Sequence, residues 1–136
     1  MSDPQSTPQL LTQRCQALRQ ALLDLHRQLL ELERRRYEKL HGAQSAGDFL
    51  QLVAFSDEMR WLEPLNRLIV LLDEALEGAA PEATPVVVGA RLQQLLGLDR
   101  TREDDAFSLA YIAHFDASPE LAAAHVRVLG LLKAAA

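Results

Sequence analysis

The four histidines and the acids near them are the residues of this chain most able to bind a metal. Glu38 and His41 form a Glu-x-x-His step, which places both groups on one helical face, as in di-iron bundles. Such a site needs a second Glu-x-x-His step, and the sequence has none. His26, His114 and His125 also lack the spacing of paired zinc ligands. We therefore expect no metal and no cofactor.

Nucleophilic catalysis has no recognisable motif here, because the sequence holds neither a Gly-x-Ser-x-Gly elbow nor a glycine-rich phosphate loop. Ser108 and His114 lie six residues apart on an expected helix and point to different sides. The function we favour is therefore not catalytic. The alternative is a small enzyme or a ligand- or metal-binding bundle with an internal pocket. The residues that would line such a pocket are Glu38, Tyr111, His114 and His125.

Three consecutive arginines, 34–36, form a basic run among glutamates. Glu31 and Arg35 are four residues apart, so the run is typical of a solvated helix face that pairs its own charges. The chain carries 14 Lys and Arg against 19 Asp and Glu, a net charge of −5. That balance argues against a nucleic-acid partner.

Trp61 lies beside Arg60 and six residues before Arg67, a composition typical of the anchor of a protein interface. The equal alternative is that Trp61 only covers the core. On this evidence we expect a non-catalytic protein that acts through protein–protein contacts, as a homodimer or an adaptor.

A helix from residue 9 to about residue 41 is predicted by a seam of apolar residues spaced 4-3-4-3-4-3. The seam ends at Arg36, and Gly42 is the expected left-handed cap. Cys15 is read as a small buried apolar residue rather than a reactive thiol. The pattern fits a seam within one chain or a seam between two copies. Its members are Leu11, Cys15, Leu18, Leu22, Leu25, Leu29 and Leu32.

A second apolar stripe covers residues 46–77, after a capping pattern at Ser45. Pro64 removes an amide from this helical pattern. Either one long helix kinks near Arg60, or two helices meet at residues 55–56. We predict a kinked or broken helix.

The remaining elements are shorter. Residues 78–85 form an internal linker rich in Gly and Pro. Helices are expected to start at Thr84-Pro85, at Thr101 with Asp104, and at Ser118-Pro119.

These helices predict an all-α fold, an antiparallel bundle of four to five helices with two long N-terminal ones. Residues 1–8 are expected to be a flexible tail and residues 9–136 one domain. The longest strongly apolar run, residues 68–72, is too short for a membrane span, and residues 1–9 do not resemble a signal peptide. With one cysteine in the chain, we expect a cytoplasmic protein.

Several segments resemble a family of small bacterial all-helical proteins of unknown function. They are Arg36-Tyr37-Glu38 before Gly42, Leu50-Gln51-Leu52, residues 61–69 running to Asp73-Glu74, and Ser118-Pro119-Glu120 with Ala124-His125. The resemblance covers about residues 14–132, and Asn66 stands where the family pattern has Ser. It implies a helical fold and no specific chemistry.

Overall fold

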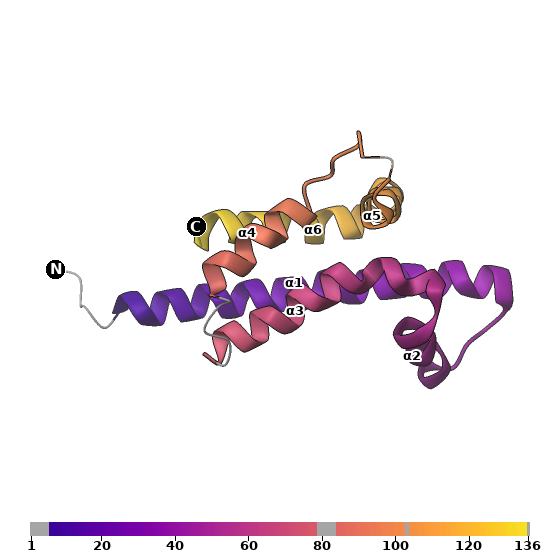
Figure 1. Ribbon diagram of the computed structural model, residues 1–136, viewed down its shortest axis with the longest axis horizontal. Helices are drawn as coiled ribbons and strands as arrows, with labels where there is room; N and C mark the ends of the chain where they lie inside the picture. The colour runs from indigo at the N-terminus through magenta and orange to yellow at the C-terminus, as the bar shows by residue number, and fades with distance from the viewer. Residues whose placement is uncertain (1–5, 79–83, 103, 136) are drawn as a thin grey trace.

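The computed structural model describes residues 6–78, 84–102 and 104–135, and all regular structure in these residues is helical (Figure 1). The predicted all-α class is confirmed. Six α-helices and one 3-10 helix occur in the described part of the chain, where the sequence predicted four to five helices. They are α1 (Ser6–His41), α2 (Ala46–Phe55), η1 (Asp57–Leu62), α3 (Glu63–Leu76), α4 (Pro85–Leu95), α5 (Ala106–Ala117) and α6 (Pro119–Ala135).

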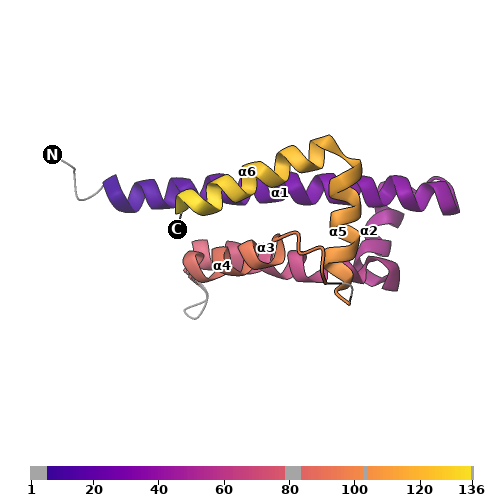
Figure 2. The same cartoon turned by 90° about the horizontal axis from the view of Figure 1, so that it is seen from above.

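The long helix α1 is the element along which the others are arranged. Both α3 and α6 run back along α1, and α4 packs on α3 and α6 (Figure 2). Helix α5 crosses these helices and contacts η1 and α6. Helix α2 projects away from the rest and packs chiefly on η1 (Figure 1).

The heptad seam is buried inside this one chain. Leu18, Leu22, Leu25 and Leu29 are all buried, and α1 packs on both α6 and α3. Cys15 is half-buried, and burial raises the pKa of its thiol, as suits an unreactive packing residue. The seam therefore needs no second copy of the chain to cover it. The side chain of its first member, Leu11, lies outside the described residues.

The second apolar stripe breaks at Ser56 rather than kinking at Arg60. Ser56 has an extended backbone, ends α2 and caps η1 through its hydroxyl oxygen, which accepts the amide of Glu58 at 3.2 Å. Pro64 has no amide to donate to the carbonyl of Arg60, and the amide of Glu63 bonds to that carbonyl instead. This three-residue step is the 3-10 pattern, so proline explains why the chain is not α-helical just before α3.

The predicted caps are confirmed at four helix ends. The hydroxyl oxygens of Ser45, Thr84 and Ser118 each accept an amide from the first turn of the following helix, at 3.1 to 3.3 Å. Gly42, directly after α1, has a positive φ of 86°, which glycine adopts at little cost. Gly78, after α3, does the same with φ of 69°. The rest of the predicted linker, 79–83, lies outside the described residues.

Two predicted boundaries are wrong. Helix α1 begins at Ser6, so residues 6–8 belong to it and not to the predicted tail, whose residues 1–5 are not described. Pro8 is tolerated there, because the amides of a first helical turn have no helical partner. Thr101 does not cap α5. It bonds Asp99 through its amide at 3.0 Å and its hydroxyl at 2.5 Å, and α5 starts only after Asp105.

Candidate functional site

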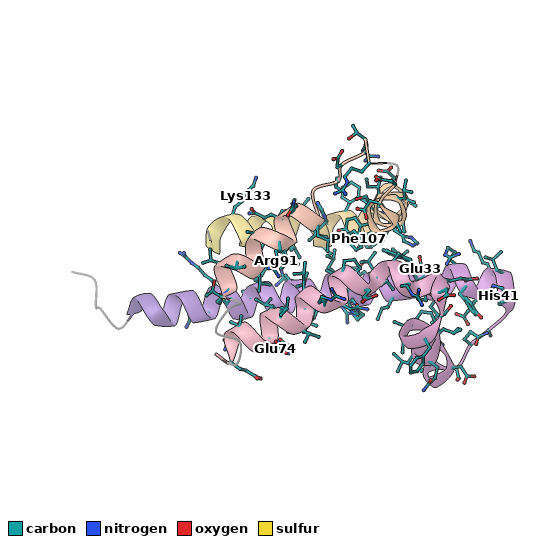
Figure 3. All side chains as sticks on the ribbon, in the orientation of Figure 1. Glu33, His41, Glu74, Arg91, Phe107 and Lys133 are labelled. Atoms are coloured by element: carbon teal, nitrogen blue, oxygen red, sulfur yellow. The ribbon has the colours of Figure 1, made fainter. Side chains whose placement is uncertain are left out.

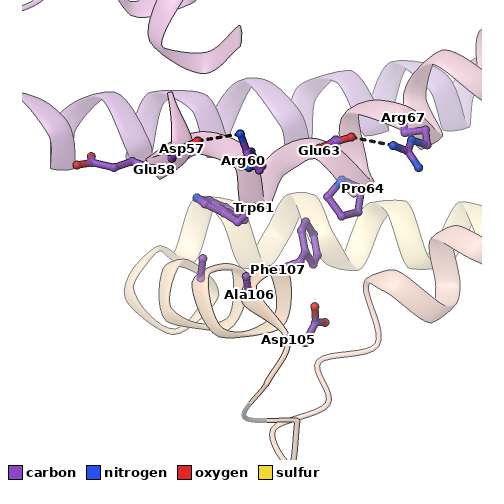
Figure 4. Close-up of a pocket in the computed structure, with 11 residues that line it drawn as sticks. Asp57, Glu58, Arg60, Trp61, Glu63, Pro64, Arg67, Asp105, Ala106 and Phe107 are labelled. Carbon is purple, nitrogen blue, oxygen red and sulfur yellow. Dashed lines mark hydrogen bonds and ion pairs between the residues drawn. The ribbon is translucent and has the colours of Figure 1, made fainter. Parts of the chain in front are cut away.

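A groove of about 570 Å³ lies between η1, the start of α3 and the start of α5 (Figure 4). Its apolar surface comes from Trp61, Pro64, Ala106, Phe107 and Ala110. The rings of Trp61 and Phe107 lie 5.7 Å apart, centroid to centroid, and are tilted by 51°. We call this site the aromatic groove; its charged lining residues are Asp57, Glu58, Arg60, Glu63, Arg67 and Asp105.

Both predicted interface arginines lie on this groove with Trp61, so the structure brings all three together. Arg60 pairs with Asp57 at 2.8 Å, and Arg67 pairs with Glu63 at 2.7 Å (Figure 4). Both guanidinium groups are mostly exposed, so these pairs fix orientation more than they stabilise the fold.

Trp61 is half-buried and is held from behind by His114. Their rings stack 6.0 Å apart, and Nε2 of His114 donates to Oε1 of Glu33 at 2.7 Å. The other oxygen of Glu33 accepts from Arg36 at 2.9 Å. Burial alone raises the pKa of Glu33, but the bonds from His114 and Arg36 outweigh it and the pKa lies below its ordinary value. The carboxylate is thus charged and links α1 to α5 through His114, and Figure 3 labels Glu33 on α1.

Glu33 is the site residue that sequence reasoning missed. Glu33 is one of the glutamates around the arginine run, which the sequence predicts to be a solvated face, yet it is 2% exposed. The available signal was its spacing, because Glu33 follows Leu29 by four residues and so lies on the buried side of α1. The rest of the run does pair its own charges: Arg35 with Glu31 at 2.8 Å, and Arg34 with Glu38 at 3.4 Å.

The predicted pocket residues do not converge on a cavity. His114 bonds Glu33 rather than Glu38, and Glu38 accepts the amide of Gln44 at 2.8 Å, which closes the turn after α1. Tyr111 and His125 meet in the core, where the phenol oxygen lies 2.7 Å from Nδ1. Neither lines the clefts described in this section.

Only one of the two ring nitrogens of His125 has a hydrogen-bond partner among the described residues. Nε2 of His125 is buried and has no hydrogen-bond partner among the described residues, and the edge of the ring contacts Phe115. Burial lowers the pKa of His125 and raises that of Tyr111, so both groups are neutral near pH 7. This neutral pair packs beneath the groove, because Tyr111 stacks on Phe107 at 5.2 Å.

A second cleft of about 400 Å³ lies on the other side of η1, against α2. Leu50 and Phe55 on its edge are 61% and 79% exposed, which is unusual for such large apolar side chains. Its charged lining residues, Arg60 and Glu63, are shared with the aromatic groove and balance each other. We call it the α2 cleft; the other residues that line it are Val53, Ala54, Ser56, Met59 and Asn66.

Comparisons with family models, curated proteins and solved structures find no match for this chain. The resemblance to a bacterial helical family therefore stays a prediction. In the described residues, no cluster of three or more His, Cys, Asp or Glu side chains could hold a metal. Of the helices described, none is both long and apolar enough to cross a membrane.

Proposed function

We propose that this chain is a non-catalytic, helical-bundle interaction protein that binds a segment of a partner protein in the aromatic groove. The observation that carries the proposal is the position of Trp61 on an open groove, with Phe107 beside it and Arg60 and Arg67 at its edge. Tryptophan and arginine are the residues that most often dominate the binding energy of interfaces.

The support beneath Trp61 also favours binding. His114 stacks on the indole and is itself held by the buried carboxylate of Glu33. A side chain that is already ordered loses little entropy when a partner binds, so more of the contact energy appears as affinity.

The alternative, a small enzyme or ligand-binding bundle, has less support. It requires polar side chains that converge on a cavity, whereas His114 is engaged by Glu33, and Tyr111 and His125 bond each other in the core. None of these three residues lines a cleft described above, and the unpartnered Nε2 of His125 is buried in the core.

A photoreactive amino acid placed at single alanines tests the proposal in the native cell. Ala106 lines the aromatic groove, Ala54 lines the α2 cleft, and Ala123 is exposed on α6 away from both. We expect the probe at Ala106 to capture one defined segment of another protein, and the purified segment to bind the full chain. Binding must be lost in Trp61→Ala. A probe at Ala106 that captures only what the Ala123 control captures would overturn the proposal.

We propose self-association as a second mode, carried by the exposed Leu50 and Phe55 beside the α2 cleft. Because the projecting side chains and the cleft share one face, two copies related by a two-fold axis can each insert Phe55 into the other. The charged residues that line that cleft balance, so no local like-charge repulsion opposes the contact. Analytical ultracentrifugation at micromolar concentration tests this mode, and a strictly monomeric chain contradicts it.

A further inference from the structure

We infer that the segment bound in the aromatic groove is cationic, an amphipathic helix with an apolar anchor flanked by Arg or Lys; this inference rests on the function proposed above. The groove is lined by four carboxylates against two guanidinium groups, a local charge of −2. The four carboxylates belong to Asp57, Glu58, Glu63 and Asp105, and the two guanidinium groups to Arg60 and Arg67.

Two of the four carboxylates form no ion pair within the described part of the chain. Each guanidinium group already pairs with one carboxylate, Arg60 with Asp57 and Arg67 with Glu63. Glu58 has no ion pair, and Asp105 accepts only the hydroxyl of Ser108, at 2.6 Å. Glu58 belongs to η1, where its carboxylate points away from Phe107, and Asp105 lies at the start of α5 (Figure 4). A partner therefore meets an apolar floor with a carboxylate at its η1 edge and another at its α5 edge.

The floor itself suits the side chains of a basic segment. The face of a tryptophan attracts a guanidinium or ammonium group within about 6 Å of the ring centre. The aliphatic stems of Arg and Lys pack on exposed apolar surface such as Pro64 and Ala106 while their charged ends reach the carboxylates at the edge. Trp61 and the carboxylates of Glu58 and Asp105 thus favour the same class of side chain.

Charge also argues against a second copy of this chain as the occupant of the aromatic groove. The chain has a net charge of −5, and two copies approaching through an acidic groove repel each other. The α2 cleft, lined by one Arg and one Glu, lacks this barrier. The two sites therefore differ in the partner that their charge admits.

Two synthetic amphipathic helical peptides without tryptophan test the inference. They carry the same leucine face, flanked by arginines in one and by glutamates in the other. Trp61 is the one tryptophan of the chain, so its fluorescence reports binding in its own groove. We expect the arginine peptide to bind the full chain at least about tenfold tighter, with an affinity that falls as salt is added.

A charge-reversed pair of variants sharpens the test. Glu58→Lys should weaken the arginine peptide by about fivefold to tenfold and strengthen the glutamate peptide. Glu74→Lys is the matched control, since Glu74 is exposed toward the opposite end of α3 and the change in net charge is the same (Figure 3). Equal binding of both peptides, preference for the glutamate peptide, binding of neither, or equal effects of the two variants would overturn the inference.

Failure of this inference is distinguishable from failure of the proposed function. If the segment captured at Ala106 proves acidic or uncharged, the groove is a partner site but the cationic assignment is wrong. If Ala106 captures no defined segment, the proposed function itself fails.

Discussion

The aromatic groove and the α2 cleft lie on opposite sides of η1 and share Arg60 and Glu63, yet their apolar side chains are held very differently. In the aromatic groove, Trp61 stacks on His114, which bonds the buried carboxylate of Glu33. That chain of contacts runs from the surface into α1, so the indole of Trp61 is supported from the core.

In the α2 cleft, by contrast, Leu50 and Phe55 project into solvent from a helix that packs chiefly on η1. No ion pair or ring contact of the described residues supports either side chain. One break in the helical pattern, at residues 56–62, thus creates two different surfaces. One has an acidic lining, and we propose that it binds a basic segment of another protein; the other is apolar with balanced charges, and we propose that it pairs with a second copy.

The largest expected effect comes from removing the buried carboxylate. Glu33→Ala leaves His114 and Arg36 without their partner, and we expect the free energy of unfolding to fall by about 3 kcal/mol. Glu31→Ala is the control, because its pair with Arg35 is exposed and should cost less than about 0.5 kcal/mol. Urea unfolding followed by circular dichroism measures both. Equal losses would show that Glu33 does not organise the groove.

Trp61→Ala should weaken binding of the partner segment by about 2 kcal/mol, or roughly thirtyfold, because it removes the aromatic anchor of the groove. Isothermal titration calorimetry with the captured segment measures the change. Phe55→Ala should leave that affinity unaltered. A larger effect of Phe55→Ala than of Trp61→Ala would show that the partner segment binds in the α2 cleft and not in the aromatic groove.

Phe55→Ser should raise the dissociation constant of the self-associated chain by about tenfold, since it removes apolar area that two copies bury. Sedimentation at several concentrations measures the constant. The side chain is 79% exposed, so the free energy of unfolding should change by less than about 0.5 kcal/mol. If Phe55→Ser leaves sedimentation unchanged, the α2 cleft is not the surface through which the chain self-associates.

The smallest expected effect is a dependence of the free energy of unfolding on pH, caused by His125 in the core beneath the aromatic groove. Burial lowers the pKa of His125 from 6.5, so below pH 6.5 the unfolded chain binds more protons than the folded one. The free energy of unfolding should therefore be greatest above pH 6.5 and decline as the pH falls toward the lowered pKa. Unfolding curves at several pH values measure this, and His125→Gln should flatten the decline. His26, whose pKa is also lowered by burial, should contribute to the decline that remains.

Much of the fold could be predicted because it depends on local patterns. The seam through Leu18 and Leu29, the caps at Ser45 and Thr84, and the glycine after α1 each follow from spacing or backbone preference within a few residues. The start of α5 could not be predicted in this way, because the bonds from Thr101 to Asp99 compete with its role as a cap.

The site was predictable only in part, because only some of its contacts are local in the sequence. Trp61, Arg60 and Arg67 are close in sequence and lie within two adjoining helical elements, so their clustering is local. The contacts that complete the site join residues far apart in sequence. Phe107 lies across the groove on α5, and the bond from His114 to Glu33 joins residues 81 positions apart. Such contacts depend on how α5 crosses α1, and no pattern within a single helix encodes that.

A titration of the isotope-labelled full chain with the arginine peptide, followed by amide and indole NMR signals, shows whether a basic segment binds in the aromatic groove. We expect the shifted signals to gather in η1, the start of α3 and the start of α5, with the indole N–H of Trp61 among the most affected. Shifts centred on α2, or an unchanged Trp61 indole at saturating peptide, would contradict it.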